Sequence, residues 1–258
     1  MTDIHPSAIV APEAELAESV SIGPFAVIGP GVRIRAGTKV SAHVVIEGLT
    51  EIGEENFIGP FACLGAEPQH TDYHGEPTRL VIGNRNRIRE YVTIHRGTAH
   101  GRGETIVGDD NFIMVGCHIA HDCVLGNGII MANQAQLAGH VLVEDYAVFG
   151  GLTGVHQYAR VGECAMVAAL SGVSLDAPPF SLVGGERARL IGLNRIGLKR
   201  KEVPPDTVQA IRRAYRMIFH SGKLLKEALE KTDAELGDVP EVKHLIQFIR
   251  TSERGVLR

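Results

Sequence analysis

Several residues that could carry out proton transfer lie between positions 118 and 156: His118, His121, Asp122, His140 and His156. An imidazole exchanges its proton near neutral pH, so a histidine can act as a general base on a hydroxyl group. A neighbouring carboxylate can orient that imidazole or stabilise its charged form. Three histidines brought together could also hold a zinc ion. The choice between these chemistries depends on how the fold arranges the residues.

The scaffold that must position them is visible as an apolar residue at every sixth position. Such a short fixed period is typical of a solenoid, in which each unit buries its apolar side chain against its neighbours, and hexads predict a parallel β-helix. The register runs Ile4, Val10, Leu16, Ile22, Ile28, Ile34, Val40, Ile46, Ile52, Ile58 and Leu64, resumes at Ile82, Ile88 and Ile94, and returns shifted by one residue at Val107, Ile113, Ile119, Leu125, Met131, Leu137, Val143, Phe149, Val155, Val161, Val167 and Val173.

The period predicts two domains. Residues 1–177 form the β-helix, interrupted by loops at 65–81 and 95–106, and loops that leave a rigid scaffold are favoured places for binding residues. The hexads stop before Pro178-Pro179, and residues 178–258 are predicted to be a connecting segment and a small helical domain. We expect its first helix to be capped by Asp206 and to end at Ser221-Gly222, followed by helices over 223–236 and 241–252.

Known triangular β-helices have three hexads per turn; the period itself does not give this number. With three hexads per turn, residues 18 apart in the sequence stack on one another at about 4.8 Å. His121 then lies beneath Gly139, which lies beneath Gln157. One neighbouring column holds Asp122 and His140, and the other holds Ala120, Ala138 and His156. The histidines are therefore predicted to cluster within roughly 10 Å of one another.

Several motifs resemble those of a known family. They are His118-Ile-Ala-His121-Asp122, Leu137-Ala-Gly-His140, Val155-His156-Gln157, Thr93-Ile-His-Arg-Gly-Thr98, Gly75-Glu-Pro-Thr-Arg79 and Gly197-Leu-Lys-Arg200. Together they resemble the bacterial UDP-N-acetylglucosamine O-acyltransferases of lipid A synthesis, which are hexapeptide-repeat transferases. The likeness covers the whole chain. It implies a mainly β protein with a left-handed parallel β-helix, a C-terminal helical domain and assembly as a homotrimer with active sites between subunits.

The resemblance implies that an (R)-3-hydroxyacyl chain passes from acyl carrier protein to the 3-position of the glucosamine ring of UDP-N-acetylglucosamine. His121 would be the general base, Asp122 its partner and the backbone N–H of Gly139 the oxyanion donor. Attack on the thioester would be direct, without an acyl-enzyme. The donor would carry phosphopantetheine, and no further cofactor and no metal are expected.

The resemblance also assigns substrate contacts. Gln69 would reach the sugar and His118 the hydroxyacyl end. His140, His156 and Gln157 would contact the sugar nucleotide. Asn194 and Arg200 would hold the uridine diphosphate from a neighbouring subunit. Ala169 would set acyl length by closing the groove between subunits, which predicts a medium-length chain.

Two positions depart from the family pattern. His70-Thr71-Asp72-Tyr73 stands where the family commonly has Asp-Leu-Lys-Tyr, and Ile196 stands where an acidic residue is often found. An acid thus replaces a cation near the substrate. The choice between a 3-hydroxyl and a 3-amino acceptor therefore stays open.

Charge and composition suggest partners and location. Residues 178–258 contain 16 Lys and Arg against 10 Asp and Glu, a net charge of +6, although the whole chain carries −4. A basic strip around Arg195, Lys199, Arg200 and Lys201 could therefore receive an acidic carrier protein, whereas no stacking motif favours nucleic acid. Neither a secretory signal nor an apolar run of membrane-spanning length is present, so we expect a cytoplasmic protein. Cys117 and Cys123 occupy small-residue hexad positions and are expected inside the solenoid.

Other readings share the scaffold. The sister N-acyltransferase of the pathway carries an additional domain before its hexads, whereas the hexads of this chain begin at Ile4. An acetyl-coenzyme A enzyme has the same solenoid, because a fold does not determine a substrate. A zinc carbonic anhydrase on this scaffold would use three histidines as ligands. A scaffold or binding module would show no turnover with any acyl donor.

Overall fold

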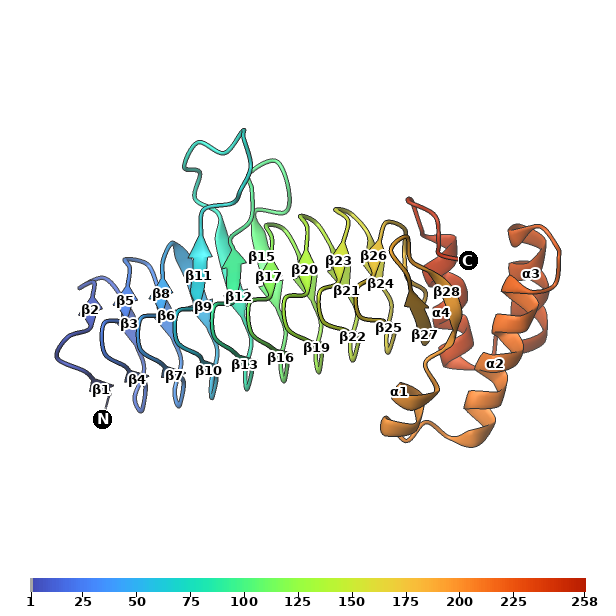
Figure 1. Cartoon of the computed structure of the whole chain (residues 1–258), viewed down its shortest axis with the longest axis horizontal. Coiled ribbons are helices and arrows are strands. Elements are labelled where there is room, and N and C mark those ends of the chain that lie inside the picture. Colours follow the sequence, from blue (N-terminus) through green and yellow to red (C-terminus); the bar gives the residue numbers. More distant parts are fainter. Residues whose placement is uncertain (1) are drawn as a thin grey trace.

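The computed structural model describes residues 2–258 and has the form of a long three-sided β-helix with helices at one end (Figure 1). Three sheets run along its sides, which we call faces A, B and C, and their strands are parallel except for β28 at the end of face A. Face A holds β1 (Asp3–Ile4), β4 (Ser21–Ile22), β7 (Lys39–Val40), β10 (Phe57–Ile58), β13 (Arg87–Ile88), β16 (Phe112–Ile113), β19 (Ile130–Met131), β22 (Val148–Phe149), β25 (Met166–Val167), β27 (Ser181–Gly184) and β28 (Arg189–Leu193).

The other two faces are shorter. Face B holds β2 (Ile9–Val10), β5 (Val27–Ile28), β8 (Val45–Ile46), β11 (Cys63–Ala66), β14 (Thr93–His95), β17 (His118–Ile119), β20 (Gln136–Leu137), β23 (Gly154–Val155) and β26 (Gly172–Val173). Face C holds β3 (Glu15–Leu16), β6 (Arg33–Ile34), β9 (Leu49–Ile52), β12 (Arg79–Ile82), β15 (Glu104–Val107), β18 (Val124–Leu125), β21 (Leu142–Val143) and β24 (Arg160–Val161).

The hexad residues fill the core. Their side chains are buried from Ile22 to Val173, and Cys117 and Cys123 are fully buried beside them. All four cysteines are free thiols, two of them in this core. Ile4 is 43 % exposed, because the first coil has a neighbouring coil on one side only. Each hexad thus contributes one apolar side chain to a core that grows by stacking.

Most corners turn through the fourth residue of a hexad, which adopts a left-handed conformation. Phe25, Phe61, Tyr91, Asp122 and His140 all have φ near +60°. This conformation costs a non-glycine residue about 1–2 kcal/mol. Backbone hydrogen bonds between coils offset part of that cost: the N–H of His140, for example, donates to the carbonyl of His121 at 3.0 Å.

Two loops leave the same corner, between faces B and C. The first follows β11 and the second follows β14 (Figure 1). Between its flanking strands the first loop spans 67–78 and the second spans 96–103, both inside the predicted interruptions at 65–81 and 95–106. The corner after β17, which carries His121 and Asp122, lies one coil further along the same edge.

The far end of the solenoid is closed by the C-terminal part. β27 still pairs in parallel with β25, and β28 then turns back antiparallel, so strand pairing continues past the last predicted hexad. Four helices follow: α1 (Arg195–Arg200), α2 (Pro205–Phe219), α3 (Leu225–Leu236) and α4 (Pro240–Arg250). Helices α2, α3 and α4 agree with the expected segments, whereas β27, β28 and α1 lie in what the sequence predicted to be a connecting segment.

The expected cap of α2 is wrong. Asp206 lies inside the first turn, and Pro204 occupies the N-cap position with no side-chain cap. Pro205 starts the helix two residues earlier, because its fixed φ and missing N–H suit the first helical position. In the described residues, none of the helices combines the length and apolar character needed to cross a membrane.

Candidate active site

His121 and Gly139 lie one above the other at the corner between faces B and C, as the 18-residue spacing predicted. The strands before them pair in register, with His118 opposite Gln136 and Ile119 opposite Leu137. A Cβ atom built on Gly139 would lie 2.8 Å from Nε2 and 2.6 Å from Cε1 of His121. Only a glycine therefore leaves this nitrogen of the imidazole accessible.

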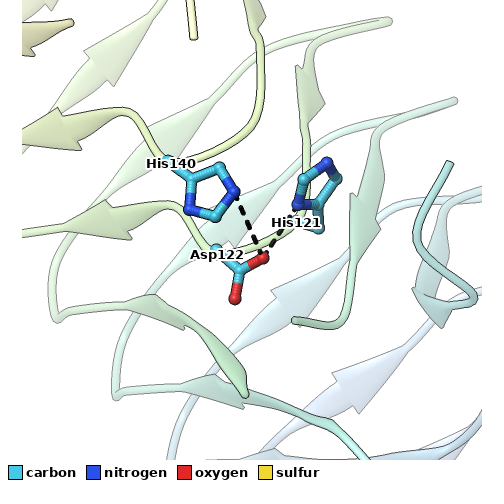
Figure 2. Close-up of side chains that lie close together, drawn as sticks. All are labelled: His121, Asp122 and His140. Carbon is cyan, nitrogen blue, oxygen red and sulfur yellow. Dashed lines mark hydrogen bonds and ion pairs between the residues drawn. The ribbon is translucent and has the colours of Figure 1, made fainter. Parts of the chain in front are cut away.

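His121 is held by the residue that follows it. Its Nδ1 lies 2.8 Å from Oδ2 of Asp122, and the two side chains point toward each other across the corner (Figure 2). Because a carboxylate only accepts, Nδ1 carries the proton of this hydrogen bond. Nε2 is then the nitrogen that can take a proton from a substrate.

Asp122 is 2 % exposed, and four donors surround its carboxylate. The hydroxyl of Thr98 donates to it at 2.7 Å, the N–H of Thr98 at 3.1 Å and the N–H of Arg102 at 2.8 Å, in addition to His121. Burial by itself would raise the pKa of the Asp122 carboxyl, but these hydrogen bonds outweigh it and lower the pKa to about 2. Asp122 therefore stays charged at neutral pH.

Two more histidines adjoin this pair. His140 stacks on Tyr158 with ring centroids 4.4 Å apart, and its Nε2 lies 3.8 Å from Oδ2 of Asp122. His118 shares a 2.7 Å hydrogen bond with the hydroxyl of Thr93. Burial lowers the pKa of both histidines. At neutral pH they are therefore uncharged groups that can donate or accept hydrogen bonds.

A cleft of about 840 Å³ opens beside His121. Gln69, His118, His156 and Gln157 line it together with His121 and Gly139. Asp122 and His140 do not line the cleft but contact His121 beside it. The structure therefore brings together the predicted residues of three successive coils, which carry His121, Gly139 and Gln157, and Gln69 of the first loop. Glu186 and Arg187, which the sequence reading did not single out, line the same cleft.

His70, which the sequence analysis noted only as a departure from the family pattern, also belongs to the site. Its ring meets that of His121 edge-on, with centroids 5.4 Å apart. Its Nδ1 accepts a hydrogen bond from the N–H of Asp72 at 3.2 Å. The signal was present in the sequence, since His70 departs from the family pattern in the first loop.

Ligand atoms of His121, Asp122 and His140 lie within 4.8 Å of one another, close enough to consider a metal ion. The carboxylate of Asp122, however, is already surrounded by donors from His121, Thr98 and Arg102. A metal would have to replace these hydrogen bonds. The donor set therefore suits an oriented base better than a metal centre.

Comparisons with known proteins decide the family. A family model described as "Udp N-acetylglucosamine O-acyltransferase; Domain 2" matches residues 176–257. Acyl-[acyl-carrier-protein]–UDP-N-acetylglucosamine O-acyltransferases from Thermodesulfovibrio yellowstonii and Halorhodospira halophila are each 50 % identical to this chain over the full length of both proteins. The chain belongs to the UDP-N-acetylglucosamine O-acyltransferase family. The family resemblance seen in the sequence is therefore confirmed.

A solved structure agrees. The UDP-N-acetylglucosamine O-acyltransferase from Moraxella catarrhalis is 42 % identical to this chain, covers 99 % of both chains and superposes with a TM-score of 0.96. This match and the parallel sheets confirm the predicted fold, a left-handed parallel β-helix followed by a helical domain.

Asn194 and Arg200 lie outside the cleft, near the helical end of this acyltransferase. Asn194 is 7 % exposed, and its side chain donates to the carbonyl of Cys164 and accepts from the N–H of Gly197, which caps α1. Arg200 is exposed at the end of α1. Within one chain, Asn194 therefore has a structural role, and the nucleotide contacts of both residues stay predictions.

Ala169 is exposed at a different corner of the β-helix, between faces A and B. His121 lies at the corner between faces B and C, so within the described residues of a single chain no groove contains both His121 and Ala169. The role of Ala169 as an acyl ruler needs a second chain and stays a prediction.

The basic strip is partly occupied. Lys201 forms an ion pair with Glu163 at 2.8 Å and lies over the ring of Tyr146. Arg195, Lys199 and Arg200 are exposed. These three side chains are the part of the strip that can meet an acidic partner.

Proposed function

We propose that the cleft beside His121 transfers a 3-hydroxyacyl chain from acyl carrier protein to the glucosamine 3-position of UDP-N-acetylglucosamine. Relatives that are 50 % identical over their full length are named acyl-[acyl-carrier-protein]–UDP-N-acetylglucosamine O-acyltransferases, which supports acyl transfer from a carrier protein to this sugar nucleotide. The observation that carries it is one imidazole, oriented by a buried carboxylate, beneath a glycine at the edge of a cleft.

His121 acts as the general base. Its Nε2 takes the proton of the acceptor hydroxyl while that oxygen attacks the thioester carbonyl carbon. Asp122 accepts from Nδ1 and stabilises the imidazolium that forms, and its low pKa keeps it charged throughout. When the carbon–sulfur bond breaks, the imidazolium returns the proton to the departing thiolate.

Gly139 stabilises the oxyanion of the tetrahedral intermediate. Its N–H donates a hydrogen bond to none of the described residues 2–258, so it is available for a ligand. An N–H fixed in place beside the reacting carbon stabilises the developing negative charge without reorganising. The attack is direct: no cysteine nucleophile is proposed, and burial raises the pKa of the Cys117 and Cys123 thiols to about 11 and about 12.

The acceptor occupies the rest of the cleft. Gln69 contacts the sugar, His140, His156 and Gln157 contact the sugar nucleotide, and His118 lies at the hydroxyacyl end. Asn194 and Arg200 of a neighbouring subunit hold the uridine diphosphate, because a planar guanidinium matches a diphosphate well. This arrangement needs active sites between subunits, and the family resemblance leads us to propose that the subunits form a homotrimer.

The donor is an acidic acyl carrier protein whose phosphopantetheine bears the acyl chain, and no further cofactor is proposed. The exposed Arg195, Lys199 and Arg200 supply positive charge for its docking. The rate with acyl carrier protein should therefore fall as ionic strength rises, and a rate independent of salt would argue against this docking surface. Both proposed substrates are water-soluble, and we place the reaction in the cytoplasm.

The deciding experiment is an acylation assay of the purified protein with UDP-N-acetylglucosamine and a panel of 3-hydroxyacyl carrier proteins. His121→Ala should fold normally and lose nearly all turnover, because a general base contributes about 10²–10⁴-fold. His220→Ala, which changes an exposed histidine in the helical domain, is the matched control and should keep full activity. Near-normal turnover by His121→Ala would remove the assigned mechanism.

Three further experiments separate the alternative functions. Acetyl-coenzyme A in place of acyl carrier protein tests whether the protein is an acetyltransferase. A 3-amino analogue of the acceptor tests whether His70 and Asp72 favour nitrogen over oxygen. Metal analysis of the active protein tests whether it is a zinc enzyme.

A further inference from the structure

The segment Thr93–Thr98 lies in the coil directly beneath the catalytic corner. Its strand β14 pairs with β17, with Thr93 opposite His118. Three of its side chains reach different parts of the site: Thr93 contacts His118, Arg96 contacts the first loop and Thr98 contacts Asp122. The mechanism above uses none of these three residues.

Of these three residues, it is Thr98 that contacts the catalytic pair of His121 and Asp122 directly. It is 3 % exposed, and both its hydroxyl and its N–H donate to the carboxylate of Asp122. The hydroxyl bonds Oδ2, the same oxygen that accepts from Nδ1 of His121. The hydroxyl of Thr98 also accepts from the N–H of Gly101, which fixes the second loop around it.

We propose that Thr98 is a positioning residue that fixes the carboxylate of Asp122 and, through it, sets the orientation and the basicity of His121. The proposal rests on the proposed function of His121 as a general base. It assigns the second loop, which lines no part of the cleft, a role in the reaction.

The physical reason is competition for one oxygen atom. Each donor to Oδ2 takes up part of its negative charge and leaves less to stabilise a protonated imidazole. Without the Thr98 hydroxyl, the carboxylate would bind the imidazolium more tightly and would also be free to rotate. His121 would then hold its proton to higher pH and would be aimed less well at the acceptor.

Other titratable groups also face His121, and they must be considered in a pH profile. They come from the first loop, from the coil beneath, from its own coil and from the coil above: His70, His95, His118, Asp122 and His140. Changing Thr98 leaves all of these groups in place. A shift of the profile can therefore be assigned to the carboxylate of Asp122.

The test compares Thr98→Val, Thr98→Ser and the unchanged chain in the pH dependence of kcat/KM. Thr98→Val should lower the plateau by roughly tenfold and move the acid limb upward by roughly half a pH unit. Thr98→Ser keeps the hydroxyl and should restore both. Thr98→Ala, which has a smaller side chain, is made in parallel in case valine prevents folding.

Thr38→Val is the matched control. Thr38 is also buried and its hydroxyl also makes two hydrogen bonds, with the carbonyl of Gly53 and the N–H of Asn56, in coils far from the site. This variant should lose stability without moving the acid limb. If a folded Thr98→Val or Thr98→Ala variant keeps the plateau and the limb of the unchanged chain, the proposal is wrong.

A double variant separates a route through Asp122 from a general structural effect. In Asp122→Asn the charge is gone, so adding Thr98→Val should cause no further shift in the titration midpoint of His121. Nuclear magnetic resonance of labelled histidine measures this midpoint without turnover. An equal shift in both backgrounds would overturn the inference. Absence of turnover by the unchanged chain would instead refute the proposed function.

Discussion

At the scale of single residues, the site depends on an absent side chain as much as on an imidazole. Gly139 is buried, and its carbonyl accepts from the N–H of Tyr158, so its backbone has little room to move. Its neighbour below is the ring of His121. The position needs glycine because of this close approach.

Gly139→Ala should therefore lower turnover at least 100-fold in a folded protein. The added Cβ would lie 2.8 Å from Nε2 of His121, closer than atoms pack, so the imidazole must move away from its working position. Steady-state kinetics with acyl carrier protein substrates measure the loss. Gly192→Ala in β28, where an added Cβ meets nothing within 4 Å, should behave like the unchanged chain. Unimpaired turnover by Gly139→Ala would contradict the stacked geometry.

His95 makes the folded state sensitive to acid. It is 7 % exposed with no partner for Nδ1 among the described residues, and burial, together with the nearby His118 and His121, lowers its pKa to about 4. The unfolded chain binds this proton near pH 6.5, so the stabilisation is complete above that pH and is lost as the pH falls from 6.5 toward 4.

His95→Leu should reduce this loss. Between pH 7 and pH 5 the free energy of unfolding of the unchanged chain should fall by about 2 kcal/mol more than that of the variant. Denaturant titrations at the two pH values measure the difference. Equal losses would mean that His95 does not titrate as its burial predicts.

At the scale of elements, the two loops assemble the site on a rigid corner. The second loop holds Asp122, and the first loop brings Gln69 and His70 to the cleft. Arg96 connects them: its guanidinium donates to the carbonyl of Gly65 at 2.8 Å and to the hydroxyl of Tyr73 at 2.9 Å. Tyr73 in turn donates to the carbonyl of Glu76, so one arginine fixes both ends of the first loop.

Arg96→Lys should loosen the first loop, because an ammonium group cannot reproduce the planar fork of hydrogen bonds. We expect faster hydrogen exchange over residues 67–78 and a roughly tenfold higher KM for the sugar nucleotide, with a smaller change in kcat. Arg87→Lys, at an exposed position on face A, is the control. Unchanged exchange and KM in Arg96→Lys would mean that the loop is held by other contacts.

At the scale of the whole molecule, the base and the predicted acyl ruler occupy different corners of one prism. Ala169 follows β25 at the corner between faces A and B. Its backbone packs closely on Gly150, because a Cβ atom added to Gly150 would lie 2.4 Å from the backbone N atom of Ala169. A groove bounded by both His121 and Ala169 therefore requires the side of a second chain. The proposed trimer supplies it.

Ala169→Met should shift acyl preference toward shorter chains without abolishing turnover, because a larger side chain fills the end of the groove. Competition between carrier proteins with different acyl lengths measures the preference. Asn133→Met changes an exposed residue of the same corner two coils below and should leave the preference unchanged. An unaltered preference in Ala169→Met would remove this residue as the ruler.

The sequence by itself determined the solenoid, because a fixed period of six converts position along the chain into position in space. Combined with the three-sided form of known β-helices, it also predicted the stacking of His121 under Gly139, and its motifs pointed to the family. It left β27, β28 and α1 unrecognised, since they follow no hexad period and are defined by pairing and packing at the end of the helix.

Only the tertiary structure decided what surrounds the catalytic pair. Thr98, Arg102 and His70 lie on loops without periodicity, so their distance from Asp122 or His121 cannot be counted in hexads. The same applies to Arg96, whose hydrogen-bond partners Gly65 and Tyr73 lie at the start of the first loop and within it. A period specifies neighbours along the stack, whereas loop contacts depend on the conformation each loop adopts over it.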